Sequence, residues 1–415
     1  MPGIVASRDE LLPFVGPPFA LPLWSAISQL PWAAAVAVWI GVVIVAITTL
    51  VFAGLRLART RVDALDVVAA CAFAAGFGPL TSAAALGQAA LPACAAIAVA
   101  PMLLGRRFVF AACIAALVAA LQPNLSLVLA ALLNVRRASI ALVGAAFIVV
   151  LGSALALAGN GGFAHYLDVL RAHAAAERFI AIQTTVAAVV RGLGGAPALA
   201  SVTAVVVAVA VAVVVATQWF SRRYDAGARV ALASAALPMA LPFAHEHDFT
   251  IAFLPAFIVV RRACGATWVV ATCAALAVAV DWLGLAQRPS GALETAALTL
   301  AAALAAATLG PKTVRMPWRF APCVVVLVVI LVARLAAAHP LPTWPDALPR
   351  DFHVPVTMPA PDVWRLEQER SGIGGLDPVW ALLRLTSLSA CAVLWFAAAR
   401  SLVLPRGDDR KAASA

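Results

Sequence analysis

The chain has 415 residues, of which 64% are hydrophobic and only 12% are charged, and its mean hydropathy is +0.99. This composition excludes a soluble globular protein with one large core. The formal net charge of +10 comes largely from Arg residues paired at the ends of apolar segments, which is typical of membrane topology signals and not of a nucleic-acid surface. The seven Cys lie in apolar segments without CxxC spacing, so we expect neither a disulfide framework nor a zinc site.

The N-terminal segment 1–31 is rich in Pro and partly polar, and no basic stretch in it leads into an apolar run. It therefore has no signal-peptide pattern, and we expect it to lie outside the membrane. We place a transmembrane domain at 32–400 and a basic tail at 401–415.

Apolar segments with short polar breaks fill the transmembrane domain. About 20 apolar residues cross a bilayer core of about 30 Å, and helices satisfy their own backbone groups in lipid. We therefore predict an all-α polytopic membrane protein. Its thirteen expected membrane segments are approximately 32–55, 65–81, 86–104, 107–121, 124–134, 138–158, 197–219, 228–244, 248–260, 263–285, 290–309, 321–338 and 377–399.

Basic residues occupy every second break between these segments. By the positive-inside rule these breaks are cytoplasmic, which places the N-terminus outside and the C-terminus in the cytoplasm. The breaks carry Arg56/Arg59/Arg61, Arg106/Arg107, Arg136/Arg137, Arg222/Arg223, Arg261/Arg262, Lys312/Arg315/Arg319 and Arg406/Arg410/Lys411.

Most other polar residues fall in the alternate breaks, which are predicted to be external. Two of these breaks are long loops, at about 159–196 and 339–376. The shorter ones include Gln88, the Gln122-Pro123-Asn124 turn and the stretch 245–248. The segments around Pro123 are short, since about 15 residues at 1.5 Å each reach only ~22 Å. We therefore expect a Pro-broken hairpin that ends inside the outer leaflet, where irregular polar backbone must line protein or water.

His245, Glu246, His247 and Asp248 form the densest ionisable cluster outside the termini. One interpretation is a solvated loop at a helix end. A second is a divalent-metal site with Asp248 as a further ligand, although the i, i+2 spacing of the two His lacks the geometry of HExxH. A third is phosphate recognition by the imidazoles, with Glu246 and Asp248 orienting a His or a sugar hydroxyl.

The remaining polar candidates each have a structural and a functional interpretation. Gln122 and Asn124 either hold the hairpin turn or bind substrate, and Gln88 is either a helix-end residue or a substrate ligand. Tyr166 lies in "HYLDVL" (165–170), which is typical of a short amphipathic external helix that covers a site.

Five stretches in order resemble glycosyltransferase family 87. Each stretch is weakly specific alone, and together they cover residues 14 to about 260. They are "FVGPPFALPLWSAISQLPWAAAVAVW" (14–39), "LGQAAL" (86–91), "AALVAALQPNLSLVLAALLNVRR" (115–137), "GGFAHYLDVL" (161–170) and "LPMALPFAHEHDFTIAFLPA" (237–256).

The resemblance implies a GT-C membrane enzyme in a bacterial-type plasma membrane. Such enzymes are similar to mannosyltransferases, which move a hexose from a polyprenyl-phosphate donor to a glycolipid or glycan acceptor at the external face. Displacement at the anomeric carbon needs a carboxylate for the acceptor proton and groups that stabilise the leaving phosphate. We expect His245 and His247 to serve the phosphate.

The resemblance also implies a catalytic acid on an external loop that precedes the Pro17-Pro18 stretch. Here the chain starts about fifteen residues before that stretch, so Asp9 is our candidate base, with Glu10 beside it. Gln122 stands where the family has a Lys. We therefore expect either that the start codon lies further upstream or that the chain is a non-catalytic homologue.

A secondary transporter or flippase for an amphiphilic substrate is the main alternative. Transporters place polar sites near the bilayer midplane on broken helices of two related repeats. No clear repeat or mid-span acid is visible in this sequence, and its polar residues favour one face.

Overall fold

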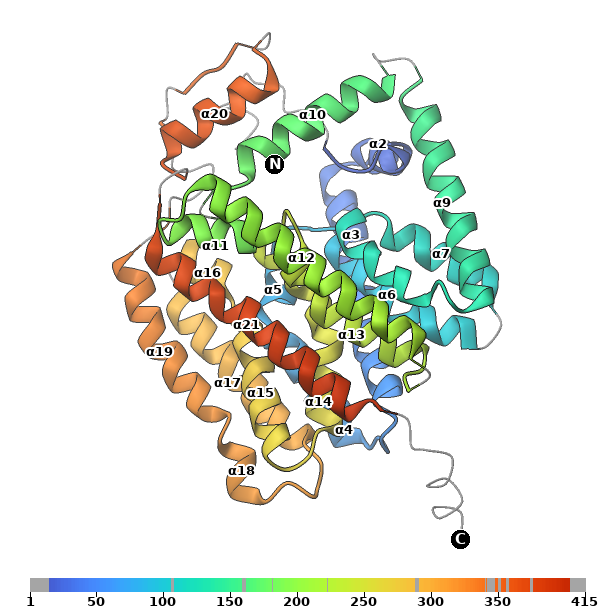
Figure 1. Ribbon diagram of the computed structural model, residues 1–415, viewed down its shortest axis with the longest axis vertical. Helices are drawn as coiled ribbons and strands as arrows, with labels where there is room; N and C mark the ends of the chain where they lie inside the picture. Colours follow the sequence, from blue (N-terminus) through green and yellow to red (C-terminus); the bar gives the residue numbers. More distant parts are fainter. Residues whose placement is uncertain are drawn as a thin grey trace.

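The computed structural model describes residues 15–105, 108–158, 162–180, 182–221, 223–287, 291–339, 341, 348–349, 352–355, 358–373 and 376–403. Within these residues the chain is helical and contains no strand, as the all-α prediction requires. Figure 1 shows an elongated bundle in which most helices run near its long axis.

The first half of the bundle runs from the N-terminal segment to α10. Its elements are η1 (Pro18–Ala20), α2 (Leu21–Ser28), α3 (Trp32–Ala58), α4 (Ala64–Ala75), α5 (Gly78–Ala85), α6 (Ala90–Gly105), α7 (Val109–Ala119), α8 (Pro123–Ser126), η2 (Leu127–Leu132), α9 (Arg136–Ala156) and α10 (Gly162–Glu177).

The second half continues from α11 to α21. Its elements are α11 (Val186–Gly192), α12 (Pro197–Phe220), α13 (Ala226–Ala240), η3 (Glu246–Ala252), α14 (Phe253–Arg262), α15 (Gly265–Ala279), α16 (Trp282–Gln287), α17 (Gly291–Leu309), α18 (Met316–Phe320), α19 (Cys323–Ala338), α20 (Ala360–Ser371) and α21 (Pro378–Ser401).

Six helical stretches among the described residues are long and apolar enough to cross a membrane. The remaining predicted segments are mostly shorter apolar helices. The segment predicted as one span at 65–81 is instead two helices, α4 and α5, whose axes are bent by 63°. The large apolar side chains of α9 and α12 are mostly exposed, as expected of surfaces that face lipid tails. The six stretches are Trp32–Ala58, Arg136–Ala156, Pro197–Gln218, Gly291–Leu309, Met316–Ala336 and Pro378–Ser401.

The bend between α4 and α5 has a steric cause in its glycines. A Cβ on Gly78 would lie 2.5 Å from the backbone N and Cα of Asp281, so only glycine allows the chain to approach so closely there. The side chain of Asp281 accepts a hydrogen bond from Ser82 Oγ at 2.8 Å, which joins α5 to the start of α16.

A cluster of buried Phe rings holds α14 against α4. The centroids of Phe77 and Phe253 are 5.4 Å apart with perpendicular planes, and Phe73 lies 6.1 Å from Phe257. Since lipid tails are as apolar as these side chains, their contribution comes from packing, with about 0.5–1.5 kcal/mol for each aromatic pair. The cluster fixes η3, which runs directly into α14.

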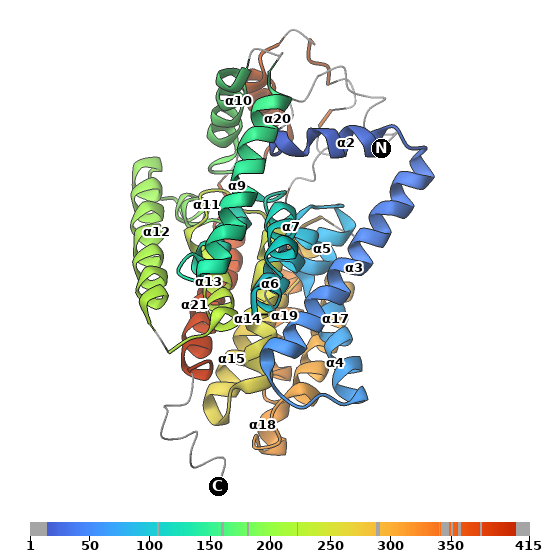
Figure 2. The same cartoon turned by 90° about the vertical axis from the view of Figure 1, so that its right-hand side faces the viewer.

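Several Arg-bearing breaks among the described residues meet at one end of the bundle. Arg59 pairs with Asp225 there, and Arg261 pairs with Asp66, the residue that completes the N-terminal capping box of α4. At the opposite end lie α2, α10 and α20 (Figures 1 and 2). The bundle therefore has a basic end, and the compartment that this end faces stays a prediction.

The structure contains the predicted helical hairpin that is broken at Pro123. Helix α7 ends at Ala119, and the chain turns through Gln122 before α8 begins at Pro123. The second arm is only one short α-helical turn followed by the 3₁₀ segment η2. The turn therefore places an irregular polar backbone next to the cluster at 245–248.

Candidate functional site

The turn at 245–248 is a buried, self-capped start of η3. The side chain of Asp248 accepts the backbone N–H of His245 at 3.0 Å, and the backbone N–H of Asp248 donates to the carbonyl of His245 at 3.0 Å. Glu246, His247 and Asp248 are buried, and His245 is half-buried. The solvated-loop interpretation therefore does not fit the turn.

Gln122 brings the hairpin turn to this cluster. Its Nε2 donates to Asp248 Oδ1 at 2.9 Å, so one carboxylate is shared between the hairpin and η3. Asn124 and Gln88 are half-buried, and among the described contacts neither side chain donates to or accepts from the turn. The structure thus joins one of the three predicted amides to the His cluster.

Glu177, the last residue of α10, binds two imidazoles at once. Its Oε1 lies 3.1 Å from Nε2 of His173, and its Oε2 lies 3.5 Å from Nε2 of His245. His173 precedes Glu177 by four residues, so both side chains lie on the same face of α10. The carboxylate therefore ties the end of α10 to the predicted site.

Gln183 completes this connection through the backbone. Its Nε2 donates to Glu177 Oε2 at 3.3 Å, while its Oε1 accepts the backbone N–H of Ala244 at 3.0 Å. The backbone N–H of Thr184 also donates to the carbonyl of Ala244 at 2.7 Å. The chain that follows α10 is thus held beside the residue that precedes His245.

The proton distribution in this group follows from burial and pairing. Burial raises the pKa of Glu177, but the hydrogen bonds and charges of His173 and His245 outweigh it and lower that pKa to about 2. Burial lowers the pKa of His245, yet its hydrogen bond to Glu177 and the charges of Glu177 and Asp248 raise it overall. Glu177 is therefore ionised, and it favours a proton on His245.

The two central residues of the turn have the opposite tendency. Burial lowers the pKa of His247 to about 4 despite the nearby charge of Asp248, so this imidazole is neutral at pH 7. Burial also raises the pKa of Glu246 to about 8. The charge of Arg384 opposes this rise, and the charge of Asp281 adds to it. The turn therefore presents less charge than its sequence suggests.

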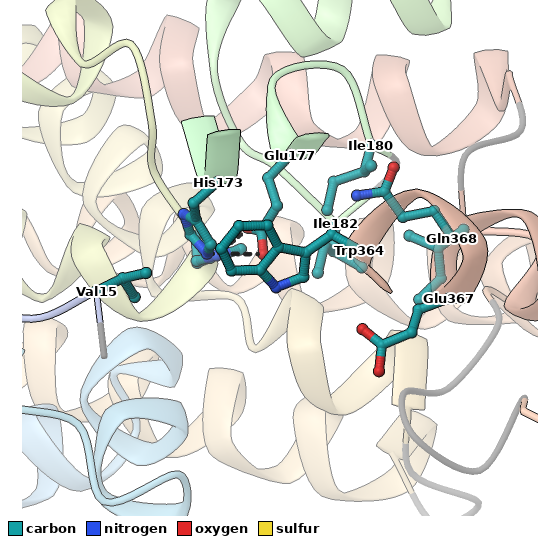
Figure 3. Close-up of a pocket in the computed structure, with 10 residues that line it drawn as sticks. Val15, His173, Glu177, Ile180, Ile182, Trp364, Glu367 and Gln368 are labelled. Atoms are coloured by element: carbon teal, nitrogen blue, oxygen red, sulfur yellow. Dashed lines mark ion pairs between the residues drawn. The ribbon is translucent and has the colours of Figure 1, made fainter. Parts of the chain in front are cut away.

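A cavity of about 270 Å³ opens beside the Glu177 group. In Figure 3, His173 and Glu177 come from α10 on one side, Glu367 and Gln368 come from α20 on the other, and the Trp364 indole lies between them. His245 also lines the cavity. The edge of the His173 ring meets the Trp364 ring at a centroid distance of 5.0 Å. The candidate site is thus a pocket with ionisable groups and one large aromatic surface.

Tyr166 lies away from the His cluster. Tyr166 donates from its hydroxyl to the carbonyl of Gly16 at 2.7 Å, which fastens α10 to the segment before Pro17-Pro18. Its pKa is raised by burial. Asp9 lies outside the described residues.

No set of metal ligands in the described part of the chain supports the interpretation of a metal site. No three His, Cys, Asp or Glu side chains there are grouped so that they could hold an ion. Asp248, the expected further ligand, accepts from Gln122 and from the His245 backbone instead.

A family model supplies the identity that the geometry alone does not. The model of glycosyltransferase family 87 matches residues 14–242, which is more than half of the chain. The chain belongs to glycosyltransferase family 87. The predicted resemblance is thereby confirmed, and no curated protein and no solved structure matches the chain. As a member of family 87 with several apolar helices, the protein is a multi-pass membrane glycosyltransferase.

The sequence alone did not predict five polar or aromatic residues that line the cavity of this family 87 member: Glu177, His173, Trp364, Glu367 and Gln368. The first two carried a signal, because a His and a Glu four residues apart follow "HYLDVL" in the same helical register. The other three residues had no such sequence signal, since nothing in the 339–376 loop indicates that it packs near α10. The family 87 match ends at residue 242, so it includes α10 but neither the His cluster nor α20.

Proposed function

We propose that this membrane glycosyltransferase moves a hexose, of the mannosyl type, from a polyprenyl-phosphate donor to a glycolipid or glycan acceptor. We place the reaction at the outer face of a bacterial-type plasma membrane, with the C-terminus in the cytoplasm. The gathering of the Arg-bearing breaks at the end away from α10 supports this orientation.

The reaction is a displacement at the anomeric carbon. The acceptor hydroxyl oxygen forms the new bond to that carbon, and the bond from the carbon to the phosphate oxygen breaks with its electron pair staying on the phosphate. The hydroxyl proton passes to a carboxylate base. We propose Asp9 for this base, because it precedes the Pro17-Pro18 stretch as the catalytic acid does in the family.

The observation that carries the proposed site is the junction of three distant segments at the turn 245–248, whose His245 lines the cavity. Glu177 of α10 holds His245, and Asp248 of the same turn holds Gln122 of the hairpin. Because His247 is neutral and the charge on His245 is matched by Glu177, we assign this turn to sugar recognition and not to the phosphate. The proposed substrate-binding residues are His245, Glu246, His247, Asp248, Gln88, Gln122, Asn124 and Tyr166.

The test is a transfer assay with the purified full chain in lipid nanodiscs. A radiolabelled polyprenyl-phosphate mannose is the donor, and glycolipids extracted from bacterial envelopes are the acceptors. We expect label to reach a glycolipid with wild type, and less transfer with His245→Ala and Asp9→Asn. His165→Ala is the matched control, since His165 is an exposed imidazole on α10.

Two results would contradict the proposal in different ways. Unchanged transfer in both His245→Ala and Asp9→Asn would remove the assigned residues while leaving the activity. Absence of transfer with every polyprenyl-phosphate sugar, together with movement of such lipids across proteoliposomes, would favour a transporter or flippase instead.

A further inference from the structure

The cavity between α10 and α20 has the size of a small-ligand subsite. Its volume of about 270 Å³ lies near the lower end of the ~300–1,000 Å³ typical of small-molecule pockets. A lipid tail needs a longer groove, whereas one pyranose ring fits such a volume. The cavity therefore suits a single sugar residue of a larger substrate.

The lining combines an aromatic surface with hydrogen-bonding groups on both sides. Trp364 contributes its indole. The His173 ring packs against this indole in a T-shaped arrangement and so fixes the orientation of the indole. Gln368 contributes an amide, which both donates and accepts, opposite the carboxylate of Glu177. An apolar face with a few convergent polar groups is the usual composition of a specific small-molecule site.

The charge of the lining favours a neutral ligand. Glu177 and Glu367 are both carboxylates, and the described residues that line the cavity include no Lys or Arg. The imidazoles of His173 and His245 lie 3.1 and 3.5 Å from the Glu177 carboxylate and pair with it. A phosphate would therefore find no guanidinium or ammonium partner in this lining, whereas sugar hydroxyls can donate to the carboxylate of Glu177.

We propose that this cavity binds an uncharged hexose of the acceptor, with Trp364 as its stacking surface and Gln368 and Glu177 as its hydroxyl ligands. The assignment to the acceptor rests on the proposed glycosyl transfer. The binding of a neutral hexose does not rest on that function, because it follows from the residues that line the cavity.

The kinetic test compares Trp364→Leu and Gln368→Ala with wild type in the transfer assay. Loss of one neutral hydrogen bond or one stacking contact weakens binding by roughly three- to tenfold. We expect the KM for the acceptor to rise by about that factor, with kcat and the KM for the donor unchanged. Trp318→Leu is the control, because Trp318 is exposed on α18 at the basic end.

A binding test keeps the inference separate from the proposed function. Saturation-transfer NMR of the full chain in nanodiscs is recorded with methyl hexosides, and in a second arm the phosphorus-31 line broadening of inorganic phosphate is measured with the same samples. We expect a hexoside signal that weakens in Gln368→Ala, a substitution at a half-buried position of α20. Wild type without hexoside binding, or phosphate binding that depends on Gln368, overturns the inference.

The two tests fail in distinguishable ways. Transfer by wild type with an unchanged acceptor KM in both variants refutes the subsite and leaves the glycosyltransferase activity standing. Absence of transfer together with Gln368-dependent hexoside binding refutes the proposed donor chemistry and retains a sugar site.

Discussion

Replacing Glu177 with Gln removes the negative charge that holds two imidazoles and leaves a side chain of the same shape. The fall of the Glu177 pKa from 4.5 to about 2 corresponds to about 3 kcal/mol, since one pKa unit is about 1.36 kcal/mol. This side chain is 18% exposed, so solvent screens the interaction only in part. We expect Glu177→Gln to lower the free energy of unfolding by no more than about that amount.

The loss depends on pH in a defined direction. A lowered carboxyl pKa contributes stability that is present above 4.5 and is lost as the pH falls toward about 2. The raised pKa of His245 contributes stability that is complete below 6.5 and is lost as the pH rises through the folded value. The difference in unfolding free energy between wild type and Glu177→Gln is therefore largest between pH 4.5 and 6.5.

Two measurements check this prediction. Denaturant unfolding is followed across pH in detergent, and the imidazole of His245 is titrated by NMR with labelled His, its resonance assigned from its loss in His245→Ala. We expect the pKa of His245 to fall in Glu177→Gln, because burial then acts on it with less opposition. Glu369→Gln, at an exposed position of α20, is the control. A pH-independent difference, or an equal loss in the control, would refute the ion-pair argument.

Three further substitutions test other contacts of the fold. Gln122→Leu leaves the buried Asp248 without its 2.9 Å donor and should destabilise the protein by about 1–3 kcal/mol, measured by denaturant unfolding. Tyr166→Phe removes the hydrogen bond to Gly16 and should cost about 0.5–1.5 kcal/mol, with faster amide exchange at residues 15–20 as its local sign. Gly78→Ala forces a methyl group against the backbone of Asp281 and should lower the thermal midpoint, whereas Gly41→Ala, with open space around it, should not.

The helical architecture was predictable because its signals are local. Apolar run length and the position of Pro and Arg placed α3, α9, α12, α17 and α21 close to their observed bounds. Two predicted spans are broken instead: 263–285 divides into α15 and α16, and 65–81 divides into α4 and α5, whose bend depends on a close approach to Asp281 about 200 residues away. Local composition carries no information on such a contact.

The site was predictable only where polar residues are dense. The cluster at 245–248 and the turn at Gln122 stood out against an apolar background, and the structure joins them through Asp248. Their burial was not predictable, because it results from η3 packing into the bundle and not from the sequence of the turn. Trp364 and Gln368 were missed because α20 resembles an ordinary amphipathic loop helix until the fold places it against α10.

The two walls of the cavity are encoded nearly 200 residues apart. The α10 wall lies within the stretch that defines family membership, and the α20 wall lies well beyond residue 242. Substitutions in α20 can thus alter which molecule is accepted without touching the features by which a relative is recognised. During synthesis, moreover, the pocket does not exist until α20 has been made, nearly 200 residues after α10.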